Sequence, residues 1–90
     1  MNIKLLGAHN CESRDTKFVS LLVDDSLVLD AGGLTSSLSL PAQQRIKAIL
    51  LTHQHYDHIR DVPAIAMNFY LSGATINIYS TLSVYNALAA

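Results

Sequence analysis

Three of the four histidines in this chain fall within six residues, directly after an apolar segment. The segment is residues 46–51 (IKAILL), which predicts a β-strand buried on both faces. Residues 52–58 (THQHYDH) follow it. We expect the strand to present this cluster at its carboxyl end, where open α/β sheets bind their ligands. The sequence therefore predicts an α/β fold with a site at one edge of the sheet.

The residue types in the cluster are those that bind zinc. Imidazole nitrogen and carboxylate oxygen are both accepted by this ion. His53 and His55 lie two residues apart after the strand, so we expect them to point to the same side and share one ion. Asp57 and His58 come further along the turn and are expected to hold a second ion. Two ions about 3.5–4 Å apart activate water and stabilise developing negative charge in hydrolases.

The spacing His53-x-His55-x-Asp57-His58 resembles the signature of the metallo-β-lactamase fold superfamily of metal-dependent hydrolases. The helical metalloprotease motif does not apply, because it needs a glutamate after the first histidine and Gln54 stands there. A histidine-rich surface turn without metal is the remaining alternative. The resemblance implies two zinc ions, with manganese or iron as substitutes, and Asp57 as a catalytic residue that holds or relays a proton.

A carboxylate is predicted at the end of another strand. Residues 17–23 and 27–30 predict a hairpin around a turn at residues 24–26. Asp30 ends the second of these strands, where an acid is costly unless it has a partner. The resemblance implies that Asp30 supports the metal site by accepting the other ring proton of a ligating histidine. An ordinary turn or cap aspartate is the alternative.

The other elements are expected to be short. We predict strands at residues 3–6 and 75–79, and helices at residues 42–45 after Pro41, at residues 59–71 with Asp61 as N-cap, and at residues 82–90 with Thr81 as cap. The buried side of the 59–71 helix is expected to contain Ile65 and Phe69, and Met67 and Tyr70 are further candidates.

A polar loop at residues 8–16 contains His9, Glu12 and Arg14. It could lie over an active site and position substrate, although a solvated connection is the simpler interpretation. Cys11 is the single cysteine, so an internal disulfide is excluded and a reducing, cytoplasmic location is expected. No apolar stretch approaches the roughly 20 residues that span a membrane, and we expect no membrane partner.

The chain is short for the fold it resembles. Residues 1–90 are interpreted as a single, partial metallo-β-lactamase-like domain, the N-terminal half of an αββα sandwich with a mixed sheet and helices on one face. Half of the residues are hydrophobic and 14% are charged, against about 25% in typical soluble domains. We therefore expect self-association or pairing with a missing C-terminal half.

The family completes its metal site with later histidines and a bridging aspartate. Beyond His58 this sequence has no histidine, cysteine or glutamate, and Asp61 is too close to bridge. We therefore expect the parent protein to be a hydrolase and this chain alone to be inactive. Residues 29–32 and 59–63, with Tyr56, resemble the class II cyclic-nucleotide phosphodiesterase and tRNA 3′-processing endonuclease branches, which implies phosphodiester substrates.

Other functions stay open at this point. Thioester and lactam hydrolases share the same opening residues. The chain could also be an inactive metal-binding or interaction fragment, or an α/β module whose histidines serve only structure. A net charge of −1 gives no basic face, so nucleic acid is not indicated as a partner, whereas a small anionic substrate is compatible with it.

Overall fold

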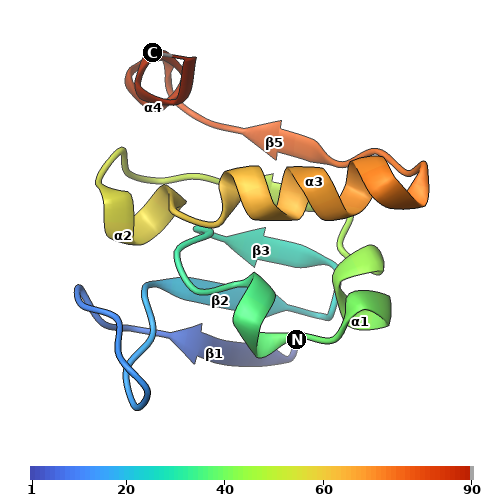
Figure 1. The fold of residues 1–90 in the computed structure, drawn as a ribbon, viewed down its shortest axis with the longest axis horizontal. Helices are drawn as coiled ribbons and strands as arrows, with labels where there is room; N and C mark the ends of the chain where they lie inside the picture. Colours follow the sequence, from blue (N-terminus) through green and yellow to red (C-terminus); the bar gives the residue numbers. More distant parts are fainter. Residues whose placement is uncertain (90) are drawn as a thin grey trace.

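The structure is a computed structural model that describes residues 1–89 (Figure 1). Within that range one sheet is formed, with the strand order β1-β2-β3-β4-β5. The strands are β1 Ile3–Gly7, β2 Ser20–Val23, β3 Leu27–Leu29, β4 Ala48–Leu50 and β5 Asn77–Tyr79. The helices are α1 Leu40–Gln44, α2 Tyr56–Ile59, α3 Val62–Ser72 and α4 Leu82–Ala89, and a 3₁₀ turn, η1, covers Thr35–Ser37.

The sheet is mixed, as the sequence predicts. The β1/β2 and β2/β3 pairs are antiparallel, whereas β3/β4 and β4/β5 are parallel. All strands except β2 therefore run in one direction, and the arrowheads of β1, β3 and β5 point the same way in Figure 1. The segments that follow β1, β3 and β4 leave the sheet at the same edge. That edge is where α2 lies (Figure 1).

The hydrophobic core lies between α3 and the face of the sheet that α3 covers. The ladder register places Leu22, Val28 and Ile49 next to one another on one face of the sheet. Ile65 and Phe69 of α3 belong to the same cluster and are buried, as predicted. Burying these side chains provides the main favourable free energy for this layer.

The prediction that β4 is buried on both faces is wrong for residues 1–89. Ile49 is fully buried, but Leu50 points to the opposite face and is 42% exposed. On that second face the register aligns a row of large side chains across all five strands: Leu5, Leu21, Leu29, Leu50 and Tyr79. We call this row the open sheet face. An apolar run predicts burial but cannot identify which segment provides the cover.

The hairpin is confirmed, with a shorter first strand than predicted. Asp24 and Asp25 both have positive φ, 51° and 58°, and the Ser26 N–H donates to the Val23 carbonyl at 3.1 Å. This geometry is a type I′ turn, which suits the twist of a hairpin. Residues 17–19 do not belong to β2. Instead, Phe18 forms an isolated bridge with His9.

The predicted helix at residues 59–71 corresponds to α3, which starts three residues later, because Ile59 is the last residue of the separate helix α2. Pro63 lies in the first turn of α3, and Gly73 ends the helix in the left-handed conformation. Asp61 occupies the N-cap position but makes no capping hydrogen bond, which corrects its predicted role. The predicted burial of Met67 and Tyr70 is also wrong, since they are 56% and 80% exposed.

The remaining elements are close to the prediction. Ser39 caps α1, which starts at Leu40, and the Thr81 hydroxyl accepts a hydrogen bond from the Val84 N–H at the start of α4. The predicted last position of α4, residue 90, lies outside the described residues. β5 is shorter than expected and exposed. Among residues 1–89 no helix has the length and apolar character needed to cross a membrane.

Candidate metal centre

The histidine cluster stands at the carboxyl end of β4, where the sequence predicts it. Leu51 is buried directly after the strand and anchors the chain there. His53 and His55 follow in an extended loop, and His55 is the N-cap residue of α2. Asp57 and His58 lie in α2 itself. One half of the motif is therefore on a loop and the other half on a helix.

Asp30 lies behind the motif, at the end of β3. Its backbone is left-handed, with φ 63°, and its side chain is buried. The carboxylate accepts hydrogen bonds from the Thr52 N–H (2.8 Å) and the Thr52 hydroxyl (2.7 Å). The other contact of this carboxylate is with His58 Nδ1, at 3.0 Å. The structure thus brings Asp30 to a histidine of the motif, and its support of a metal ligand stays a prediction.

The backbone of α2 is fixed to the strand ends by close contacts. The Ala31 N–H donates to the His58 carbonyl at 2.7 Å, and the Val19 N–H donates to the Asp57 carbonyl at 3.0 Å. At Gly32, an added Cβ would come within 1.8 Å of the Asp57 carbonyl oxygen. Only glycine lets the backbones approach this closely. The position of Asp57 therefore depends on the absence of a side chain at position 32.

The four predicted ligands form two neighbouring pairs. His53 Nε2 lies 2.8 Å from His55 Nδ1, with the rings edge-to-face and their centroids 4.0 Å apart. Asp57 Oδ2 lies 3.6 Å from His58 Nε2. The rings of His53 and His58 are 5.1 Å apart between centroids, which places the two pairs side by side. Their roles as metal ligands stay a prediction.

The donor atoms of the two pairs are of the types that zinc binds, but each pair provides fewer ligands than one zinc ion needs. Two nitrogens bound to one tetrahedral zinc ion at 2.0–2.1 Å would be about 3.3 Å apart, so His53 and His55 need to separate only slightly. Among residues 1–89, however, no group of three or more histidine, cysteine, aspartate or glutamate side chains is arranged to hold one ion. Catalytic zinc usually has three protein ligands. The described residues therefore supply part of a metal site.

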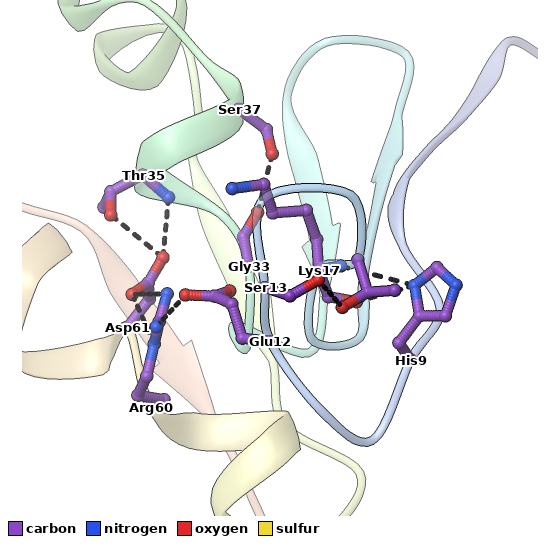
Figure 2. A network of polar contacts seen from close by, with 10 residues as sticks. His9, Glu12, Ser13, Lys17, Gly33, Thr35, Ser37, Arg60 and Asp61 are labelled. Carbon is purple, nitrogen blue, oxygen red and sulfur yellow. Dashed lines mark hydrogen bonds and ion pairs between the residues drawn. The ribbon is translucent and has the colours of Figure 1, made fainter.

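Sequence reasoning missed a charged network beside the motif (Figure 2). The Arg60 guanidinium donates to Glu12, and it also contacts the Asp61 carboxylate at 3.2 Å. Asp61 in turn accepts hydrogen bonds from the Thr35 N–H (2.8 Å) and hydroxyl (2.9 Å). The sequence signal was the adjacent pair Arg60-Asp61, but its partners lie 48 and 26 residues away.

The environment of Arg60 favours its charged form. Partial burial lowers the pKa of the guanidinium, but the hydrogen bond to Glu12 and the negative charges of Asp61 and Glu12 outweigh it, so the pKa is raised. The guanidinium also lies over the Phe18 ring, 5.2 Å from its centroid. Phe18 packs edge-to-face against Tyr56 of α2, with centroids 5.9 Å apart.

Comparison with known proteins supports the fold. The metallo-beta-lactamase fold protein YhfI from Bacillus subtilis superposes with a TM-score of 0.78, covering 93% of this chain and 38% of that one, at 20% sequence identity. This likeness confirms the predicted fold class.

A curated relative is similar in sequence. A hydroxyacylglutathione hydrolase from Stenotrophomonas maltophilia (strain R551-3) is 41% identical over an alignment of 56 residues, and the match covers 58% of this chain and 22% of that protein. The present chain thus spans about a fifth of the length of this relative.

A family model also matches. The model described as a beta-lactamase superfamily domain covers residues 21–90, which is well over half of the chain and includes most of the hairpin, Asp30 and the histidine motif. The resemblance inferred from the motif is confirmed: this chain belongs to the beta-lactamase superfamily.

Proposed function

We propose that this chain is part of a metal-dependent hydrolase and that it supplies the first ligands of the metal site. The proposal is carried by one observation, the gathering of His53, His55, Asp57 and His58 in two adjoining pairs at the carboxyl edge of the sheet. His53 and His55 would hold one ion, and Asp57 and His58 the other. Zinc is the proposed metal, with manganese or iron as substitutes.

In this proposal the protein orients its ligands through hydrogen bonds. Asp30 accepts a hydrogen bond from the Nδ1–H of His58, which leaves Nε2 with a lone pair for an ion. Asp57 holds or relays the proton that is lost from water. When bound, the ions lower the pKa of water and stabilise the negative charge that develops on the substrate.

The site needs more ligands than residues 1–89 supply. The chain spans 38% of the structural relative and 22% of the curated one. Our proposal therefore assigns the other ligands to further protein, either a C-terminal half or a partner chain, and the 90-residue chain alone is proposed to be inactive.

The proposed substrates are small anionic phosphodiesters. The supporting feature is the sequence around the motif, Tyr56 and residues 59–63, which resembles the phosphodiesterase branches. Thioesters are the second candidate, because the curated relative is named as a hydroxyacylglutathione hydrolase. Both reactions use the same activated water on an electrophilic centre, so the motif alone does not separate them.

Metal analysis and a substrate panel test the proposal. The complete protein, purified with zinc or manganese, is assayed for bound metal and for hydrolysis of bis(p-nitrophenyl) phosphate, a hydroxyacylglutathione and nitrocefin. We expect turnover of the phosphodiester. Turnover of the thioester alone would select the second candidate. Stoichiometric metal with no turnover of any of the three would contradict hydrolysis.

Histidine variants test the ligands. His53→Ala and His55→Ala should each lower the metal content, and the matched control His9→Ala should not, because His9 lies in an exposed loop and contacts Lys17. Equal metal content in all three variants would instead indicate that the motif histidines serve only structure.

An interaction fragment without catalytic activity is the other function that an observation favours. The open sheet face presents Leu5 and Leu50 at 66% and 42% exposure. Light scattering on the 90-residue chain tests it, since a monodisperse monomer would argue against pairing through this face.

A further inference from the structure

The connection between β1 and β2, residues 8–19, is docked on the helix that bears half of the metal motif. β1 runs parallel to β3 and β4, so this connection leaves the sheet at the motif edge. At its far end the Val19 N–H donates to the Asp57 carbonyl. Phe18 packs against Tyr56, one residue before that carbonyl. The base of the connection is therefore fixed beside the site.

The tip of the connection has few other attachments. Ser13 and Thr16 bond to each other, through their hydroxyls at 2.8 Å and from the Ser13 N–H to the Thr16 carbonyl at 3.0 Å. The side chains of Arg14 and Asp15 are 94% and 83% exposed. These contacts shape the tip but do not place it relative to the sheet. The hydrogen bond from Arg60 to Glu12 connects the tip to the segment between α2 and α3 (Figure 2).

Glu12 depends on Arg60 for its position. Its side chain is 23% exposed, and its Oε1 atom is buried with no hydrogen-bond partner among residues 1–89. Removing Arg60 would leave a largely buried carboxylate unpaired, which costs more than the net gain of a typical hydrogen bond. The connection would then move so that Glu12 reaches water.

We propose that Arg60 is a positioning residue that fixes the β1–β2 connection as one wall of the metal site and thereby sets the affinity for substrate. The effect on substrate affinity rests on the proposed function. Arg60 contacts two carboxylates and the face of Phe18 at once. A planar guanidinium can do this, whereas the compact ammonium of lysine cannot.

Trypsin cleavage after the exposed Arg14 measures the position of the connection without any substrate. In the complete protein, Arg60→Met and Glu12→Gln should each speed this cleavage about tenfold, and Arg60→Lys should rescue only part of the effect. The matched control is Thr35→Ala, which removes the hydroxyl that donates to Asp61. Asp61 is the other carboxylate that Arg60 contacts, besides Glu12. This control should lower the melting temperature and leave the cleavage rate unchanged.

Two results would overturn the anchoring role. One is an unchanged cleavage rate in both Glu12→Gln and Arg60→Met. The other is an equal increase in Thr35→Ala, which would mean that the whole fold loosens. Since Glu12→Gln preserves shape, it keeps the test valid even if Arg60→Met fails to fold.

Kinetics with bis(p-nitrophenyl) phosphate test the link to substrate. Glu12→Gln should raise KM about tenfold with kcat within about twofold, because the wall contacts substrate and not the reacting atoms. A faster cleavage rate with unchanged KM would overturn the substrate role. If the wild type does not hydrolyse the probe, the proposed function fails, and the cleavage rates still decide whether Arg60 anchors the connection.

Discussion

The two halves of the metal motif differ in how firmly the protein holds them. Asp57 and His58 lie on α2, and their side chains are 20% and 23% exposed. Their carbonyls accept hydrogen bonds from the Val19 and Ala31 N–H groups, and the His58 ring contacts the Asp30 carboxylate. His53 and His55 lie on an exposed loop, where their rings contact each other. The half on α2 is therefore ordered by contacts with residues far away in the chain, whereas the loop half is ordered by the contact between its two histidines.

Because of this difference, we expect the two halves to contribute unequally to the stability of the fold and to metal binding. Ligands that are ordered before binding lose less conformational entropy when the ion arrives, so the α2 half is better prepared for an ion. The same order means that its supporting residues contribute to folding. The loop half should contribute little to folding and should become rigid only with metal bound. The following substitutions test this separation, starting with the largest expected effect.

Replacing Asp30 should be the most costly change. Asp30→Ala removes the acceptor for the Thr52 N–H and hydroxyl and places alanine at a φ of 63°. We expect the free energy of unfolding to fall by about 3 kcal/mol, measured by urea denaturation. Asp30→Asn, which tolerates this φ and keeps one acceptor, should lose about half as much. Equal losses would show that the charge itself is essential.

A side chain at Gly32 should push α2 away from the strand ends. Gly32→Ala places a Cβ against the Asp57 carbonyl, and we expect a loss of about 2 kcal/mol in thermal unfolding together with weaker metal binding. The control is Gly73→Ala, where the added Cβ meets no atom within 4 Å but φ is 74°. That variant should lose about 1 kcal/mol and retain its metal.

The histidines themselves should show the contrast between the two halves. His58→Ala removes the contact with Asp30, so we expect a loss of about 1.5 kcal/mol in metal-free protein. His53→Ala and His55→Ala should each change stability by less than about 0.5 kcal/mol, as exposed residues do. Chemical denaturation with a chelator present measures all three. Similar losses at His53 and His58 would remove the distinction between the halves.

Much of the fold was predictable because its signals are local. The hairpin turn at Asp24 and Asp25 and the Thr81 cap each depend on neighbours a few residues away. Errors arose where distant contacts decide the outcome. Asp61 has the sequence of an N-cap, yet its carboxylate bonds to Thr35, 26 residues away.

The site divides in the same way. The histidine and aspartate spacing could be read directly, because it reflects chain geometry over six residues after a strand. The Arg60 link to Glu12 could not, because an ion pair across 48 residues leaves no periodic pattern.

The sequence by itself determined the order of elements, the residue types of the metal motif and its position after a strand, because hydrophobic spacing and turn chemistry act between near neighbours. Only the tertiary structure decided that Asp30 meets His58, that Gly32 touches the Asp57 backbone and that Leu50 remains exposed. These outcomes depend on which parallel strands align and which face the helices cover. Such pairings form between residues far apart in the chain, where single-residue preferences carry no information about the partner.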